Sequence, residues 1–101
     1  MPDNAGSQIA VPASRKFALG HLVATPNALA QIANDEIIAA LSRHVQCDWG
    51  DLDEHDRNAN DQALVRGERL LSSYRSTRGV KFWIITEWDR SVTTVLLPED
   101  Y

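Results

Sequence analysis

Three runs of β-branched and aromatic residues near the end of the sequence constrain the fold more than any other feature. The runs cover residues 69–76, 80–88 and 92–97, and their composition is typical of strands. Only residues 77–79 and 89–91 separate them, and connections this short are typical of β-hairpins. The spacing therefore predicts an antiparallel meander of three strands.

The first half of the sequence predicts one strand followed by two helices. Phe17–Ala24 is an apolar run typical of a strand. Thr25-Pro26 pairs a capping residue with a proline at the first helical position, which predicts a short helix ending near Ala33. Apolar residues at helical spacing from Asp35 to Val45 predict a second helix, with Asn34-Asp35 as its cap.

A third helix is predicted before the meander. Asp53 is a candidate N-cap, the helix is expected over 54–66, and Gly67 is typical of the left-handed residue that ends a helix. The order of elements is therefore β-α-α-α-β-β-β. We expect an α+β fold in which an antiparallel sheet of three or four strands packs on helices.

The length of 101 residues suits one small domain. Residues 1–13 are rich in Pro, Gly, Ser and Asn, which predicts a flexible N-terminal tail and a single domain over 14–101. One cysteine, Cys47, cannot form an internal disulfide and favours the reducing cytoplasm. The sequence has neither a signal-peptide pattern nor an apolar run of the ~18 residues that a membrane span needs, so we expect a cytoplasmic protein without membrane contact.

The charged residues are unevenly distributed. The formal net charge is −4, but residues 47–61 hold six acidic side chains against one basic, whereas residues 66–90 hold six basic against three acidic. The helix dipole explains part of the acidic run, with Asp53 as the cap. The other carboxylates predict an acidic surface that binds a partner: Asp48, Asp51, Glu54, Asp56 and Asp61.

Direct DNA binding is not expected from these charges. The net charge is negative, which disfavours nonspecific binding to phosphates. Two adjacent helices also occur in helix-turn-helix proteins, but Asp35 and Glu36 would place negative charge where a recognition helix meets phosphate. A plain helical hairpin is therefore favoured, although the basic half of the chain leaves a local anion site open.

The middle run of the meander carries large apolar side chains on both faces of its strand. Phe82 and Ile84 alternate with Trp83 and Ile85. A sheet with helices on one side needs only one apolar face, so the other must be covered too. We expect a homodimer or a complex with a partner protein, because one apolar patch would otherwise be exposed: Trp83, Ile85, Val95 and Leu97.

Five side chains of the types that bind metal ions lie close together in the sequence. They lie within twelve residues and match no strong zinc pattern: His44, Cys47, Asp48, Asp51 and His55. For His44 the simpler interpretation is a positive imidazole near a helix C-terminus, and for Cys47 a small buried side chain. We therefore predict no metal site.

The meander also holds an alternative anion site formed by Tyr74, Arg75 and Arg90, with Thr93 and Thr94 nearby. Small metal-independent ribonucleases use a base, an arginine and a hydroxyl donor on a curved sheet, and here the base would be Glu87 or a distant histidine. Cross-strand pairing on a solvated face is the simpler interpretation. There is no Gly-rich phosphate loop, Cys-x-x-Cys or recognisable Ser-His-Asp arrangement, so no catalytic residue and no cofactor is predicted.

Residues 17–101 resemble a family of small bacterial proteins called plasmid-related proteins. The resemblance is carried by FALGHLVATPNAL at 17–29, RHVQCDWGDL at 43–52 and WIITEWDRSVTTVLLPEDY at 83–101. Some members are called type I restriction endonuclease subunit M, but this chain lacks the Gly-rich turn and the Asn-Pro-Pro-aromatic loop of a methyltransferase. The resemblance implies a connection with plasmids and defence systems, and it supplies no catalytic residues.

Two main hypotheses follow. The first is a non-enzymatic accessory protein of a mobile genetic element that binds a protein partner, in its sharpest form an anti-restriction or anti-CRISPR inhibitor whose acidic surface faces a basic nucleic-acid channel. The alternative is a small metal-independent nuclease-like or toxin-like domain that uses the basic sheet face. A housekeeping dimer without either role is a third interpretation.

Overall fold

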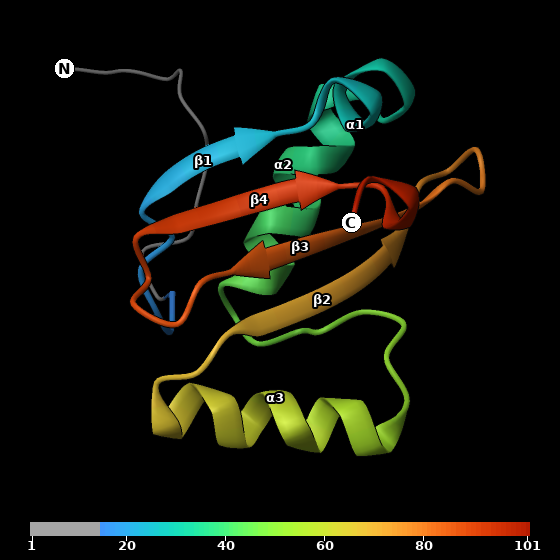
Figure 1. Ribbon diagram of the computed structural model, residues 1–101. Coiled ribbons are helices and arrows are strands. Elements are labelled where there is room, and N and C mark those ends of the chain that lie inside the picture. Colours follow the sequence, from blue (N-terminus) through green and yellow to red (C-terminus); the bar gives the residue numbers. More distant parts are fainter. Residues whose placement is uncertain (1–14) are drawn as a thin grey trace, which may run out of the picture.

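The computed structural model describes residues 15–101 and contains a four-stranded sheet with three helices (Figure 1). The predicted flexible tail, residues 1–13, lies outside the described residues. The elements in chain order are β1 (His21–Ala24), α1 (Pro26–Gln31), α2 (Asn34–His44), α3 (Glu54–Arg66), β2 (Leu70–Arg75), β3 (Lys81–Thr86), β4 (Val92–Leu96) and the 3₁₀ turn η2 (Pro98–Asp100). The predicted α+β fold and its order of elements are confirmed.

The sheet is mixed, and its strand order is β1-β4-β3-β2. The pairs β2–β3 and β3–β4 are antiparallel, as the meander predicts. β1 instead lies parallel to β4, with His21 opposite Val92 and Ala24 opposite Val95. The prediction of a wholly antiparallel sheet is therefore wrong at this edge. The three helices return the chain to the end of the sheet where β1 begins, so β2 and β4 run in the same direction as β1.

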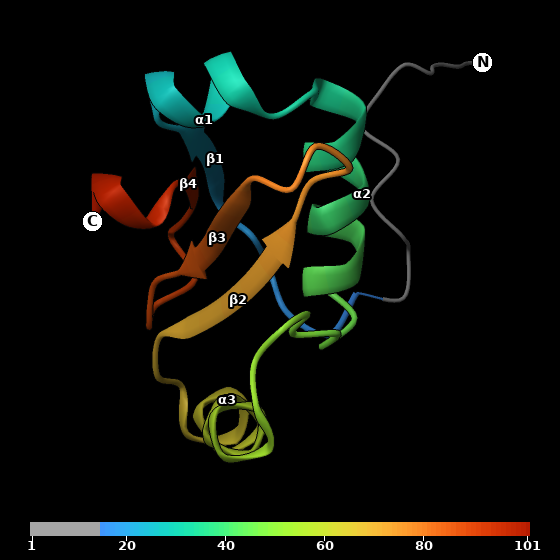
Figure 2. The same cartoon turned by 90° about the vertical axis from the view of Figure 1, so that its right-hand side faces the viewer.

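The core lies between the sheet and α2. Figure 2 shows α2 along one side of the sheet, which we call the helix side, and η2 with the C-terminus on the other, which we call the outer face. Ile37 and Leu41 of α2 and Phe82 and Ile84 of β3 belong to one buried cluster. The alternation along β3 therefore directs the side chains as predicted, with Trp83 on the outer face.

Local capping signals explain where α1 and α3 begin and end. The Thr25 side chain accepts the amide of Ala28 at 3.1 Å, and Asp53 accepts the amide of Asp56 at 2.8 Å. α3 ends at Gly67, whose φ of 73° lies in the left-handed region that glycine adopts without strain. These predicted caps are confirmed.

The second helix and the first strand differ from their predicted starts. α2 begins at Asn34, and Ala33 occupies the cap position without a side-chain hydrogen bond. The predicted Asn34-Asp35 cap is therefore wrong. Both residues lie in the first turn of α2, where the helix dipole stabilises the carboxylate of Asp35. β1 begins at His21 because Gly20, with a φ of 66°, interrupts the extended run.

The end of the chain covers part of the outer face. The ring of Trp83 lies 5.9 Å from the ring of Tyr101, centroid to centroid, and Ile85 is only 3% exposed. Val95 and Leu97 belong to the core on the helix side. The predicted apolar patch is thus not exposed as a unit, because two of its members lie on each side of the sheet. The exposed patch therefore no longer supports a homodimer, which stays a prediction.

No helix within residues 15–101 has the length and apolar character needed to cross a membrane.

Candidate functional site

A buried chain of hydrogen bonds joins α2 to the strands. His44 is fully buried, with Nδ1 at 2.5 Å from Ser72 Oγ and Nε2 at 2.9 Å from Thr86 Oγ1. Thr86 Oγ1 lies 2.8 Å from Thr93 Oγ1, and the Thr93 hydroxyl donates to the carbonyl of Leu19 at 2.7 Å. The chain of bonds therefore connects α2, β2, β3, β4 and the segment before β1.

The last of these bonds fixes the direction of the two before it. Because Thr93 donates to a carbonyl, its oxygen accepts from Thr86, and the Thr86 oxygen accepts from His44 Nε2–H. Burial, with a smaller effect of the Arg90 charge, lowers the pKa of His44 to about 3. The imidazole is therefore neutral near pH 7, and its Nδ1 accepts from the Ser72 hydroxyl. The predicted positive imidazole is wrong, and a Ser–His pair sealed from solvent has a structural role.

The candidate metal ligands around His44 do not form a site. Both ring nitrogens of His44 are already hydrogen-bonded, and Asp48 forms a 2.7 Å ion pair with Arg43. Burial raises the pKa of the Cys47 thiol, which disfavours the thiolate that binds metals. His44, Cys47 and Asp48 are therefore unfavourable metal ligands in this fold, and the absence of a metal site stays a prediction.

Three neighbouring side chains do bring possible ligand atoms together. Single atoms of Asp53, His55 and Asp56 lie within 4.8 Å of one another, and all three residues are exposed. Asp53 Oδ1 already accepts the Asp56 amide as the helix cap. The group therefore lacks the enclosed ligand set of a structural metal site.

The predicted anion site is divided by the fold. Arg75 lies opposite Lys81 at one end of the β2–β3 hairpin. Arg90 donates to the carbonyl of Glu68 at 2.7 Å, beyond the other end. A strand of six residues spans roughly 17 Å, so the two guanidinium groups do not converge on one phosphate.

The hydroxyl groups of that set are also unavailable. Tyr74 is 2% exposed, its hydroxyl donates to the carbonyl of Asp48 at 2.7 Å, and burial raises its pKa. Thr93 is also buried, and its hydroxyl belongs to the chain of hydrogen bonds that begins at His44. Thr94 and Glu87 are half-buried.

Two of the predicted partner-binding carboxylates support the fold. Asp48 pairs with Arg43 and also accepts the amide of Gly50 at 3.2 Å. Asp61 accepts the indole N–H of Trp49 at 2.9 Å. Both therefore fix the segment that leads from α2 to α3.

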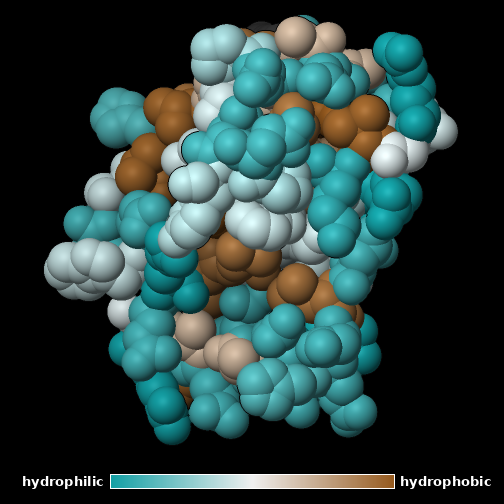
Figure 3. Space-filling view, turned by 45° about the vertical axis from the view of Figure 1, so that its right-hand side comes forward, coloured by the Kyte–Doolittle hydropathy of each residue, from teal (hydrophilic) through white to brown (hydrophobic). Residues whose placement is uncertain are grey.

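The other three carboxylates, Asp51, Glu54 and Asp56, form what we call the acidic surface. All are exposed. Asp56 contacts only its neighbour His55, at 3.3 Å, and within residues 15–101 the Asp51 and Glu54 side chains form no hydrogen bond or ion pair. In Figure 3 the lower part of the molecule, over α3, is mostly hydrophilic.

The acidic surface stands on a helix that the sheet edge holds by polar contacts. Asn60 donates to the carbonyl of Leu71 at 2.5 Å and accepts its amide at 3.2 Å, as a neighbouring strand would. Of the 13 residues of α3, only Asn60 and Ala63 are buried. Nearly the whole surface of α3 is therefore available to a partner.

A close backbone contact positions the start of this region. The amide of Asp51 donates to the carbonyl of Ser73 at 2.7 Å, and the amide of Ser73 donates to the carbonyl of Trp49 at 3.1 Å. Gly50 between them has a φ of 76°, and a Cβ there would lie 2.0 Å from the Ser73 oxygen. Glycine is therefore required for the chain to approach β2.

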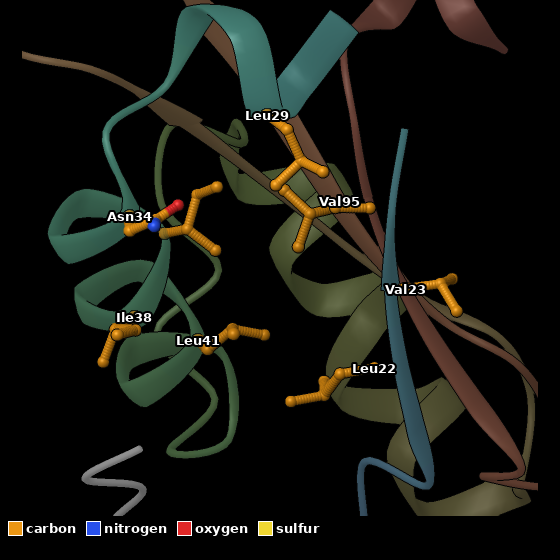
Figure 4. Close-up of a pocket in the computed structure, with 9 residues that line it drawn as sticks. Leu22, Val23, Leu29, Asn34, Ile38, Leu41 and Val95 are labelled. Atoms are coloured by element: carbon orange, nitrogen blue, oxygen red, sulfur yellow. The ribbon is translucent and has the colours of Figure 1, made fainter. Parts of the chain in front are cut away.

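An apolar groove lies between β1, α1 and α2. Its volume is about 390 Å³, and its lining residues are Leu22, Val23, Ala24, Leu29, Asn34, Ile37, Ile38, Leu41 and Val95. Figure 4 shows Leu22 and Leu41 pointing toward each other across it, whereas Val23 points away. None of its lining side chains is titratable, so the groove offers apolar contact and no acid–base chemistry.

Two contacts that shape these surfaces have no local sequence signal. The first is the Asn60–Leu71 pair. The second is Asp100, which accepts from Thr25 Oγ1 at 2.6 Å and from Asn27 Nδ2 at 2.7 Å and so holds η2 against α1. Each joins residues that only the folded chain brings together.

Comparisons with known proteins add no functional assignment. The sequence matches no family model, and neither the curated proteins nor the solved structures give a significant match.

Proposed function

We propose that this protein is a non-catalytic binding protein whose acidic surface recognises a positively charged region of a macromolecular partner. One observation carries the proposal. The fold uses Asp53 as a cap and Asp48 and Asp61 as hydrogen-bond partners, but it leaves Asp51, Glu54 and Asp56 exposed within six consecutive residues. Glu54 and Asp56 gain only about 0.3–1 kcal/mol each from the dipole of α3, whereas like charges held together repel, so the cluster as a whole favours recognition.

The exposure of α3 supports the same proposal. A helix that buries two of its residues contributes little apolar area to the core, yet it presents its first turn and its long exposed side to solvent. Val65, at 86% exposed, lies near the other end of this helix, roughly 14 Å along the helix axis from Asp56, and offers an apolar contact. Together these features suit a partner that combines basic and apolar groups.

Two of the predicted partner-binding residues do not belong to this surface. Ile85 is buried within its own chain, and Trp83 lies half-buried under Tyr101 on the outer face. The partner-binding surface that we propose is therefore confined to α3 and the turn before it.

The resemblance to plasmid-related proteins suggests which partner to test. It supports an accessory role on a mobile genetic element, in the cytoplasm, against a complex that processes nucleic acid. Restriction and CRISPR complexes hold nucleic acid in basic channels, to which an acidic surface is electrostatically complementary. The nuclease-like alternative gains no support from the geometry, since its arginines are separated and its hydroxyl groups are buried.

Self-association, if it occurs, would use a different region from the predicted patch. Leu22, Val23 and Leu29 are 39%, 47% and 56% exposed beside the free edge of β1. Edge strands with apolar side chains are prone to pair with another chain. Light scattering of the wild type and of Leu22→Lys would test the homodimer. The wild type should be a dimer, and the substitution should dissociate it into monomers.

The acidic surface is tested by affinity capture from the native host followed by mass spectrometry. The baits are the wild type and the variant Asp51→Asn/Glu54→Gln/Asp56→Asn. A control variant, Asp35→Asn/Glu68→Gln/Glu99→Gln, removes the same number of exposed charges elsewhere. The proposal requires a partner that the control retains and the first variant loses. Equal capture by all three baits would refute it.

A further inference from the structure

The outer face of the sheet carries an aromatic and basic surface that the proposed function does not use. Trp83 lies opposite Ser73 on β2 and Leu96 on β4, and its ring contacts Tyr101 edge to face. Tyr101 is 68% exposed. Ser73, Ile85 and Leu96 around Trp83 are buried on this face, so the accessible π surface is mainly the ring of Tyr101 and the half-buried edge of Trp83.

Two cations lie directly opposite each other next to these rings. Arg75 pairs with Lys81 in the register of β2 and β3, one pair beyond Ser73 and Trp83 on the same face. Like charges directly opposite on neighbouring strands destabilise a sheet. Both side chains are exposed, and the ion pairs of residues 15–101, Arg43–Asp48 and His55–Asp56, involve neither. Arg75 does donate to the carbonyl of Gly79 at 3.2 Å, but no carboxylate within residues 15–101 forms an ion pair with either cation.

A third cation approaches the rings from the other side. Arg69 donates to the Tyr101 hydroxyl at 2.6 Å, and its guanidinium carbon lies 5.4 Å from the ring centroid. Arg78 adds a further exposed charge in the hairpin turn. Of the acidic residues near these rings in the sequence, Asp100 accepts hydrogen bonds from Thr25 and Asn27, and Glu87 and Glu99 form no ion pair within the described residues.

The spacing of these groups suits one class of ligand. Lys81 and Trp83 are two residues apart on one strand, which places a cation and an aromatic ring roughly 7 Å apart on the same face. Aromatic platforms bordered by cations bind single-stranded nucleic acid by stacking bases and neutralising phosphates. We propose that the outer face binds single-stranded nucleic acid, with Tyr101 and Trp83 stacking bases and Arg75 and Lys81 contacting phosphates.

The negative net charge does not oppose this inference, because phosphate contacts depend on the local field. The acidic surface lies with α3 beyond the β2 edge of the sheet, whereas the C-terminal turn lies on the outer face (Figures 1 and 2). The expectation of no direct DNA binding rested on the total charge, which averages these two regions. The inference is independent of the proposed function, since it uses a different surface.

Fluorescence anisotropy with labelled 12-nucleotide U and dT oligonucleotides at several salt concentrations tests the proposal. Binding to at least one of them is expected, with Tyr101→Ala weakening it about 5- to 150-fold. Tyr101→Phe, which keeps the ring, should stay close to the wild type. Arg75→Ala/Lys81→Ala should lower the slope of log K against log salt by about 1.4, at about 0.7 for each phosphate contact.

A matched control removes the same charge elsewhere. Arg15→Ala/Arg66→Ala replaces two exposed arginines outside the outer face and should leave the affinity nearly unchanged. Thermal melting confirms that each variant folds. The proposal is overturned if no oligonucleotide binds at low salt, if the control loses as much affinity as Arg75→Ala/Lys81→Ala, or if a 12-residue polyglutamate or a DNA duplex binds as tightly as the single strands.

Discussion

The two longest helices of this protein have opposite roles. α2 buries Ile37, Ala40, Leu41 and His44 against the sheet, whereas α3, although longer, buries only Asn60 and Ala63. α2 therefore stabilises the core, and α3 is itself held in place by polar contacts at the sheet edge. The difference suggests that substitutions on α2 change stability, and that substitutions on the exposed side of α3 change recognition.

The largest expected effect comes from removing the His44 side chain on α2. His44→Ala would leave a cavity and would leave the Ser72 and Thr86 hydroxyls without their buried partner. We expect a loss of about 3–5 kcal/mol in the free energy of unfolding, measured by urea denaturation. His55→Ala, an exposed histidine on α3, should change it by less than about 0.5 kcal/mol. Equal effects would contradict the distinction between the helices.

Acid should weaken α2 packing before carboxylates are protonated. The pKa of His44 is about 3 in the folded protein, against a usual value of 6.5. The unfolded chain therefore binds a proton that the folded chain does not, so stability is complete above about pH 6.5 and falls as pH decreases toward 3. The slope is about 1.4 kcal/mol per pH unit, or about 2–3 kcal/mol between pH 6.5 and 4.5.

Urea titrations across this range give the measurement, and His44→Gln provides the control. This variant should be less stable throughout but should lose less stability between pH 6.5 and 4.5. Below that range Asp48, Asp89 and Asp100 add to the loss, because hydrogen bonds lower the pKa of each carboxyl. An equal slope in wild type and variant would contradict a buried neutral His44.

The contact that holds α3 should have a smaller effect than the core of α2. Asn60→Ala removes both hydrogen bonds to Leu71 and leaves its backbone groups at the edge of the sheet. We expect about 1–2 kcal/mol of destabilisation. Hydrogen exchange should show faster exchange of the Leu71 amide and of α3, while the amides of β3 and β4 change less. Unchanged exchange at Leu71 would show that this pair does not hold the helix.

Local signals predicted much of the fold, and long-range contacts account for the rest. The caps at Thr25 and Asp53 and the end of α3 at Gly67 depend on neighbours within a few residues, so the sequence reveals them. The direction of β1 relative to β4 depends on how three helices return the chain, which periodicity does not report.

The candidate sites follow the same rule. The neutral state of His44 depends on Ser72 and Thr86, which lie 28 and 42 residues away in the sequence. The acidic run is visible in the sequence, but which of its members are free of structural roles is not, since Asp61 is paired with the Trp49 indole only in the folded chain. The placement of Arg75 opposite Lys81 on the outer face likewise depends on the register of β2 with β3, which the sequence alone does not give.

Neutralising the acidic surface should have the smallest effect on stability and the clearest effect on binding. In Asp51→Asn/Glu54→Gln/Asp56→Asn the cap Asp53 is intact, so the free energy of unfolding should stay within about 1 kcal/mol of the wild type. The decisive measurement is the association rate with the captured partner as a function of ionic strength. The account predicts slower association and a flatter salt dependence for the variant, because charge steering acts within a Debye length of about 8 Å at physiological salt. A folded variant with the rate and salt dependence of the wild type would contradict it.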